Sequence, residues 1–399
     1  MLRNSLQLYR NAYHGLPVAM WWLALVMFIN RSGTMVIPFL TVYLTTKGYS
    51  LAQAGYVMAA FGSGAILGGY IGGRLTDRFG HYHVQVVSLL LNGIMFLVLG
   101  QMNSFWEITI CIFVLSTLGE SFRPANSAAI AAYSDDNNRT RCYSLNRLAI
   151  NAGWAVGPAV GGFLANKSYS LLFWADGLTC ISAGLFLMIV FSSSPSGSVQ
   201  KNKEELVEVR SAYKDKTFLL GMLYIFLVGI CFFQLFSMMP VYYKENIGMN
   251  ETMIGWLLAM NGIIIVLIEM VLVYKLESRG KAVHYMMLGS FLIGLAFLVM
   301  GIGPFFVVAF CSMIIITFGE MLLFPFMNNF WVKRSDARNR GQYAGIYTMS
   351  FSAAIVLAPT FASQLATWFG FQVLWIVNCL VCMVATAGYF LLKKRMQDE

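Results

Sequence analysis

Long apolar runs recur along the whole chain, and they limit its fold more than any other feature of the sequence. A helix needs about 20 mainly apolar residues to cross the hydrocarbon core of a membrane. Twelve segments bounded by polar residues, glycine or proline meet this requirement. They occupy residues 17–45, 50–73, 82–102, 106–131, 144–165, 170–192, 217–243, 251–274, 282–301, 304–330, 342–365 and 371–392. The sequence therefore predicts an all-α integral membrane protein with twelve transmembrane helices.

The composition excludes the main soluble classes. Hydrophobic residues make up 58% of the chain and charged residues 11%, whereas a soluble domain carries about 25% charged residues. A cytosolic enzyme, a secreted disulfide scaffold and a disordered chain are all excluded on this ground. The seven cysteines form no metal-ligand cluster, and no nucleophile stands with a base. We therefore expect no metal, no cofactor and no enzymatic activity.

Basic residues are distributed unevenly between the two sides of the predicted membrane. With the N-terminus inside, 21 of the 27 lysines and arginines fall on the cytoplasmic side, and only Lys47, Lys167 and Lys244 fall outside. Cytoplasmic loops of membrane proteins carry such an excess. We therefore predict a multi-pass protein of the cell (inner) membrane with both termini in the cytoplasm. The net charge of +9 is then an orientation signal, and no nucleic-acid partner is expected.

The two halves of the chain repeat each other at an offset of about 200 residues. Thr117–Glu120 (TLGE) matches Thr317–Glu320 (TFGE), and Gly157-Pro158 matches Ala358-Pro359. We expect two pseudo-symmetric six-helix bundles, residues 1–192 and 217–399, joined by a cytoplasmic linker, residues 193–216. Parallel repeats of this kind occur in transporters whose site lies between the halves.

The loop expected after the second span carries a recognisable motif. Residues 73–80, GRLTDRFG, resemble the G-x-L-x-D-R-x-G loop of the major facilitator superfamily. The resemblance implies the twelve-helix fold of that family and a latch that holds its halves together on the cytoplasmic side. The latch residues would be Gly73, Asp77, Arg78 and Gly80. The family's basic residues after the last glycine are replaced here by His81, Tyr82 and His83, which leaves the charge partners of the latch open.

The fifth span resembles a second motif, the antiporter motif G-x-x-x-G-P-x-x-G-G. Its residues here are Gly153, Gly157, Pro158, Gly161 and Gly162. Small residues allow two membrane helices to pack closely. In the family the motif is associated with twelve-span drug:proton antiporters, so the resemblance implies proton-driven export.

A competing resemblance concerns the first span. Arg31, together with Gly319-Glu320 followed by Pro325, is similar to the proton-coupled oligopeptide transporters of the same superfamily. Their E-x-x-E-R-F stretch has Met27 and Asn30 here in place of its two acids. Proton-coupled uptake of a peptide-like or amino-acid-like solute therefore remains the alternative.

Charged side chains inside the predicted spans are the candidate functional residues. Each costs about 2.5–3.5 kcal/mol at mid-bilayer, so it is retained where it pairs, lines water or functions. The deep charges are Arg31, Glu120, Arg123, Glu269 and Glu320, whereas Asp176 is expected nearer a span end. Glu120 shares a helix face with Arg123, whereas Glu320 has no basic residue within a turn of its own helix. A lone carboxylate among apolar residues favours its protonated form, and we predict Glu320 as the main proton carrier.

Glu120 and Glu269 are further candidates for proton coupling. The predicted substrate site combines charged, amide and aromatic side chains, which suits small amphipathic compounds. Its members are Arg31, Arg123, Asn126, Asn151, Gln234, Phe236, Asn261 and Phe324. The sequence predicts a monomeric secondary transporter that lies in the lipid bilayer and binds a small-molecule substrate and protons. It would export amphipathic compounds by alternating access, driven by the proton gradient; a non-transporting receptor with this fold is a further alternative.

Overall fold

The fold is helical throughout the part of the chain that the computed structural model describes. That part comprises residues 15–135, 138–191, 211–277, 282–335 and 340–398, and it contains helices but no strand. Most of the predicted linker, residues 193–210, lies outside the described residues.

The helices of the first half follow the predicted spans closely. They are α2 (Val18–Ser32), α3 (Val36–Thr46), α4 (Leu51–Phe79), α5 (His81–Leu99), α6 (Phe105–Tyr133), α7 (Arg139–Lys167) and α8 (Ser170–Phe191). Two of them, α2 and α3, are the halves of one span that is interrupted between residues 32 and 36.

The second half repeats this order. It comprises the short 3-10 helix η1 (Ala212–Lys214), then α9 (Lys216–Phe232), η2 (Phe233–Phe236), α10 (Met238–Glu245), α11 (Glu251–Glu277), α12 (Ala282–Met300), α13 (Phe306–Arg334) and α14 (Arg340–Asp398). Span seven is also interrupted, at η2 and Ser237.

The number of spans agrees with the sequence prediction. Eleven helices in the described residues are long and apolar enough to cross a membrane, and the last of these covers Gly345–Met396. Gly370 interrupts it with φ 82° and ψ 168°, a conformation that glycine adopts without steric cost. The last helix is therefore two spans, and the prediction of twelve is confirmed.

The chain divides into two compact units. One unit comprises Met1–Val36 with Ser63–Asn202, and the other comprises Ile37–Gly62 with Lys203–Glu399. From the sequence we had assigned residues 37–62 to the first bundle, whereas here they group with the second unit. The chain first passes from one unit to the other directly after Val36.

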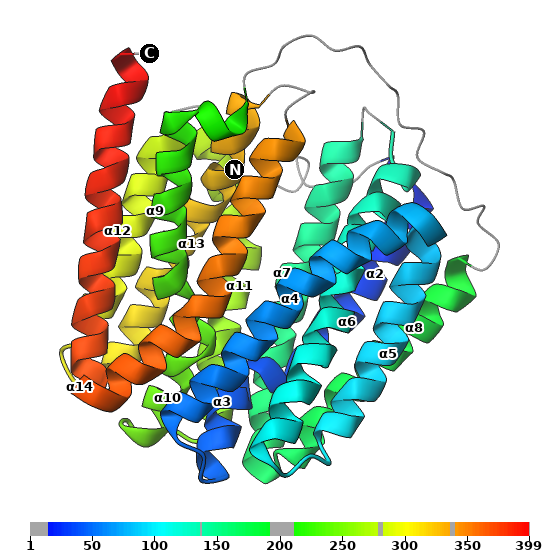
Figure 1. Cartoon of the computed structure of the whole chain (residues 1–399), viewed down its shortest axis with the longest axis horizontal. Helices are drawn as coiled ribbons and strands as arrows, with labels where there is room; N and C mark the ends of the chain where they lie inside the picture. Colours follow the sequence, from blue (N-terminus) through cyan, green and yellow to red (C-terminus); the bar gives the residue numbers. More distant parts are fainter. Residues whose placement is uncertain (1–14, 136–137, 192–210, 278–281, 336–339, 399) are drawn as a thin grey trace, which may run out of the picture. The chain divides into compact units, whose positions relative to one another are not determined.

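The same helix packing occurs in both units (Figure 1). In the first unit, α5 packs against α6 and α8, and α2 packs against α7 and α8. In the second unit, α12 packs against α13 and α14, and α9 packs against α14. The structural repeat thus matches the sequence repeat.

The turn after the second span is shorter than the sequence suggested. We placed Gly73–Gly80 in a loop, but α4 continues to Phe79 and only Gly80 leaves the helix, with φ 81°. The residues between the motif's glycines are compatible with a helix, and only the positive φ at position 80 requires glycine.

Candidate functional site

The charged residues of the first unit gather around the last turn of α2. Glu120 and Arg123, one turn apart on α6, form an ion pair at 3.2 Å. Their side chains are 19% and 65% exposed, respectively, so the pair is open on its arginine side. The charges of Glu120 and Arg123 both act on Arg31. The Nε atom of Arg31 is buried and has no hydrogen-bond partner among the described residues.

The first span is interrupted after Ser32, one residue beyond Arg31. The amide of Gly33 donates to the Ile29 carbonyl at 3.3 Å and that of Thr34 donates to the Arg31 carbonyl at 3.1 Å, which ends α2. A new helix, α3, starts at Val36. Interrupted spans with polar helix ends are a recurring way to build sites inside membrane transporters.

Asp176 of α8 occupies this interruption. Its carboxylate accepts the amide N–H of Met35 at 3.0 Å and that of Val36 at 2.8 Å. Asp176 lies nearer the start of α8 (Ser170–Phe191) than its middle, and its side chain is fully buried, 0% exposed. The sequence could not reveal this role, because the two donors are backbone amides about 140 residues away.

The antiporter motif of α7 packs on the other side of the same interruption. A Cβ atom at Gly153 would overlap Arg31, one at Gly157 would lie 3.0 Å from the Thr34 carbonyl, and one at Gly161 would lie 2.9 Å from the Cβ of Met35. The motif glycines therefore let α7 approach the point where the first span breaks. Pro158 and Gly162 are buried in the same helix.

Asn126 and Asn151, two predicted substrate contacts of the first unit, differ in burial. Asn126 is 4% exposed, accepts from Gln85 at 3.3 Å and donates to Asn146 at 3.2 Å. Its amide thus joins α5, α6 and α7. Asn151 is half-buried on α7.

In the second unit, the equivalent carboxylate has a neutral donor. The Asn261 amide of α11 donates to Glu320 of α13 at 3.1 Å and to the Thr317 hydroxyl at 3.0 Å. Glu320 lies at the position that matches Glu120 in the repeat. The two matched acids therefore differ in partner: an arginine beside Glu120 and an amide beside Glu320.

Gln234 holds the interruption of span seven. Its side-chain amide donates to the Ile230 carbonyl at 3.0 Å and to the Ala358 carbonyl at 3.2 Å, and its oxygen accepts from Ser237 at 3.3 Å. Because Gln234 is also 0% exposed, it stabilises the backbone in this structure.

Aromatic side chains form a continuous row one turn from Glu320. Phe324 lies 4.7 Å from Phe232 and 5.6 Å from Phe351, measured between ring centroids. The row continues to Tyr347, at 6.2 Å from Phe351, and to Trp331, at 5.9 Å from Tyr347. Phe236, a predicted contact, lies 6.0 Å from Phe232. The row joins α9, α13 and α14, and Phe324 is half-buried.

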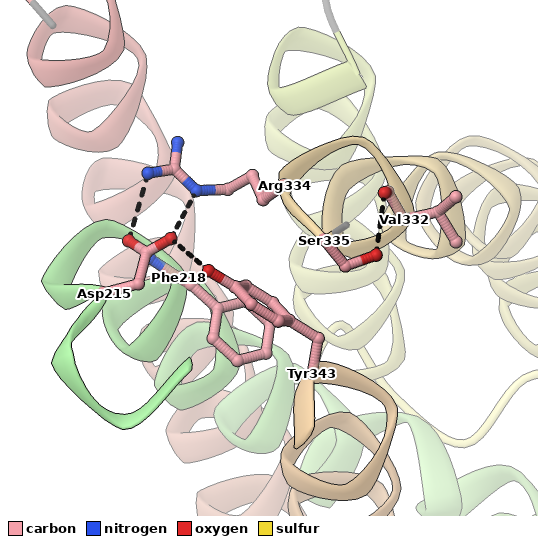
Figure 2. Close-up of polar contacts among 6 residues, drawn as sticks. All are labelled: Asp215, Phe218, Val332, Arg334, Ser335 and Tyr343. Carbon is pink, nitrogen blue, oxygen red and sulfur yellow. Dashed lines mark hydrogen bonds and ion pairs between the residues drawn. The ribbon is translucent and has the colours of Figure 1, made fainter. Parts of the chain in front are cut away.

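A polar cluster at the start of α9 was not predicted (Figure 2). Asp215 accepts two hydrogen bonds from Arg334, at 2.9 and 3.0 Å, one from the Tyr343 hydroxyl at 3.0 Å and one from the Phe218 amide at 3.0 Å. Burial opposes ionisation of Asp215, but these hydrogen bonds outweigh it and lower the pKa of the carboxyl below its usual range. The available sequence signal was an aspartate directly before a span, the position of a helix N-cap.

The remaining predicted residues lie apart from these groups. Asp77 and Arg78 are exposed at the end of α4, where the Arg78 guanidinium lies 5.1 Å from the Phe79 ring. Gly73 has open space beside it. Glu269 is buried, 6% exposed, on α11. Their roles in latching and coupling stay predictions.

Twelve apolar spans in the described residues, arranged in two units with the same helix packing and with Glu120 matched to Glu320 in the sequence repeat, are the plan of a membrane transporter. The Major Facilitator Superfamily model matches residues 20–359, and the chain belongs to this family. The family resemblance expected from the sequence motifs is thereby confirmed.

Two relatives are similar to this chain in sequence, and one solved structure is similar to it in fold. A Na(+), Li(+), K(+)/H(+) antiporter of Planococcus maritimus is 25% identical over 91% of this chain and 92% of its own length. Multidrug resistance protein MdtH of Proteus mirabilis is 22% identical over 72% of each chain. A crystal structure of a POT family transporter in complex with 5-aminolevulinic acid shares the fold. Its TM-score is 0.81 at 16% identity, over 94% of this chain and 96% of that one.

Proposed function

We propose that this protein is a proton-driven antiporter that exports small amphipathic compounds across the cell (inner) membrane by alternating access. The observation that carries the proposal is the difference between its two matched carboxylates. Glu120 has Arg123 at 3.2 Å, whereas Glu320 accepts from the amide of Asn261 at 3.1 Å. Protonation of Glu120 would break its ion pair with Arg123, whereas the half-buried Glu320 can accept from the amide of Asn261 in either protonation state.

This difference divides the work between the two units. Glu320 is the proton carrier in the second unit, and Glu120, Arg123 and Arg31 form a polar substrate-binding group in the first unit. Within the second unit, the row of aromatic side chains that begins one turn from Glu320 offers an apolar surface, because flat rings bind amphipathic molecules with little loss of side-chain entropy. Proton binding and substrate binding then favour different conformations, which is what couples the two fluxes. The proton gradient supplies the energy, and no cofactor takes part.

The relatives support the direction of transport. One is named as an antiporter that exchanges cations for protons, and another as a multidrug resistance protein. The glycines of α7 that resemble the antiporter motif pack against Arg31 and the interruption beside it, so the motif contacts the charged group rather than lying apart from it.

A second candidate function is proton-coupled uptake of a peptide-like or amino-acid-like solute. The buried Nε of Arg31, which has no hydrogen-bond partner among the described residues, favours it. A substrate carboxylate would satisfy this donor.

The test is transport by purified protein in proteoliposomes with an imposed pH gradient. The probes are ethidium, a cation; norfloxacin, a zwitterion; and alanyl-alanine, a dipeptide. Export predicts that an acidic lumen drives ethidium or norfloxacin into the vesicles, and that nigericin abolishes this accumulation. Accumulation of the dipeptide from an acidic medium would instead establish the second function. No gradient-dependent movement of any probe would contradict both.

A further inference from the structure

We propose that Asp176 is a positioning residue: by binding the two backbone amides that begin α3, it fixes the interruption of the first span and so holds Arg31 beside Glu120. The inference rests on the proposed function only in that Arg31 serves the substrate site. The hydrogen bonds and packing that carry it lie within the first unit.

The Asp176 carboxylate caps the N-terminus of α3. Its Oδ1 accepts from the Met35 amide at 3.0 Å, and its Oδ2 accepts from the Val36 amide at 2.8 Å. The first amides of a helix have no partner within it, and the helix dipole favours a negative charge at that end. Inside a membrane no water replaces a lost partner, so each such bond weighs more than it does at a surface.

One face of α8 packs along residues 30–36, the segment in which the first span is interrupted. Asp176, Thr179 and Cys180 lie three and four residues apart, which places them on the same side of the helix. Thr179 leaves no room for a Cβ at Gly33, and Cys180 accepts from the Asn30 amide at 3.5 Å. Three contacts in register therefore hold residues 30–36 against α8.

Arg31 lies between these contacts. Arg31 is in the last turn of α2, at the negative end of that helix dipole. The Asp176 carboxylate of α8 lies at the start of α3, the positive end of the dipole of α3. The charge of Glu120 acts on Arg31, and α7 packs on it through Gly153. A shift of residues 33–36 would therefore move Arg31 relative to Glu120. The chain also passes from the first unit to the second directly after Val36.

The repeat shows that this carboxylate is not a general requirement of the fold. The second half of span seven starts at Met238, 202 residues after Val36, and Asn378 lies 202 residues after Asp176. Neither side-chain polar atom of Asn378 has a hydrogen-bond partner among the described residues. In the second unit the interruption is held by Gln234 instead. The carboxylate cap is thus specific to the unit that contains Arg31.

The first experiment measures hydrogen exchange of the intact protein in detergent. Asp176→Asn keeps the shape of the side chain, but its amide nitrogen is a hydrogen-bond donor and would face the backbone N–H donors of Met35 and Val36. Peptides covering residues 33–36 should exchange at least about tenfold faster, because a hydrogen bond to a charged group is lost. Val36→Pro removes one amide donor at a first helical position, where proline is tolerated, and should act in the same direction. Asp215→Asn, an equally buried carboxylate of the second unit, is the matched control and should leave these peptides unchanged.

The second experiment asks whether Asp176 acts through Arg31. The unfolding midpoints of Asp176→Asn, Arg31→Gln and the double variant form a thermodynamic cycle. We expect the unfolding midpoint of the double variant to fall by clearly less than the sum of the two single-variant shifts, because a displaced Arg31 no longer interacts with Glu120. The cycle of Asp215→Asn with Arg31→Gln should be additive.

Transport gives the third measurement. Asp176→Asn should raise the KM for norfloxacin by about tenfold, as expected for a lost charge-assisted contact, but not in the Arg31→Gln background. Unchanged exchange at residues 33–36, or an additive cycle, would overturn the proposal. Failure of the wild-type protein to move any probe would sink the proposed function instead, and the exchange and unfolding measurements would still decide the role of Asp176.

Discussion

Arg334, the last residue of α13, binds Asp215 through two parallel hydrogen bonds, Nε to Oδ2 at 2.9 Å and Nη2 to Oδ1 at 3.0 Å (Figure 2). The two residues are 119 positions apart in the chain. Gln342 adds to this attachment by accepting from the Ala212 amide at 3.1 Å. The segment that leads from the linker into span seven is therefore fixed to α13 and to the start of α14.

Removing the charge of Asp215 should weaken the second unit and change its acid response. The lowered pKa of Asp215 means that its stabilisation is present above the unfolded pKa of about 3.9. It is lost as the pH falls through the lower folded value. Asp215→Asn should cost about 1.5–3 kcal/mol near neutral pH, the range for hydrogen bonds to a charged group. Thermal unfolding in detergent between pH 3 and 7 measures both effects.

The wild-type protein should lose more stability than Asp215→Asn as the medium is acidified below about pH 4. Asp135→Asn changes an exposed carboxylate and serves as the control, with no expected change. Parallel pH curves for the wild type and Asp215→Asn would show that the ion pair contributes nothing.

Glu320→Gln tests proton coupling, because glutamine resembles the permanently protonated acid. It should abolish accumulation driven by a pH gradient while leaving downhill exchange of substrate largely intact. Glu120→Gln should weaken substrate binding more than it alters pH dependence, since Glu120 pairs with Arg123. Tracer exchange and gradient-driven uptake in the same proteoliposomes separate the two effects. Full gradient-driven transport in Glu320→Gln would move the coupling role to Glu120 or Glu269.

Asp77→Asn tests the cytoplasmic latch. Asp77 is exposed at the end of α4, so the substitution should not disturb the core. We expect transport to fall by about tenfold while substrate binding survives, because a change of about 1.4 kcal/mol in a conformational equilibrium has this size. Equal loss of binding and transport would argue against a latch.

Close packing at the interrupted span gives a stability prediction. A Cβ at Gly33 would overlap Thr179, so Gly33→Ala should cost about 1–3 kcal/mol. Gly69→Ala is the matched control, since nothing lies within 4 Å of a Cβ there and alanine favours a helix. Thr179→Gly in the Gly33→Ala background should restore part of the loss. Equal effects of the two alanine substitutions would contradict the close contact.

Cysteine labelling tests the orientation. A cysteine at Ser198, which lies outside the described residues, should react with impermeant reagents only from the cytoplasm, and one at Asn250 only from outside. The expectation follows from the 21 basic residues on one side of the membrane. Labelling of both sites from the same side would overturn the assignment of the spans between them.

Much of the fold was predictable from local sequence. Each apolar run of about 20 residues became a helix, because a chain in lipid must satisfy its backbone within each span. Span ends were less predictable: α4 extends to Phe79, where Arg74 and Arg78 continue the helix beyond the apolar run. The interruptions of the first and seventh spans were not foreseen, since the apolar runs pass through both without a break.

The candidate site, like the fold, was only partly predictable from the sequence. The sequence identified Arg31, Glu120, Arg123 and Glu320 because a charge in an apolar run is conspicuous and costly. It also related Glu120 to Glu320 through the repeat. It could not pair Glu320 with Asn261, nor could it show that Asn126 and Gln234 bond within their own unit.

The sequence by itself determined the class of protein, the number of spans and the family, because these depend on hydrophobic length, on the repeat and on motifs read along the chain. Only the tertiary structure decided which buried groups satisfy one another. Asp176 with the amides of Met35 and Val36, and Asp215 with Arg334, are contacts between residues more than 100 positions apart. A buried charge requires partners, but their identity depends on which helix faces pack together, and neither spacing nor composition encodes that choice.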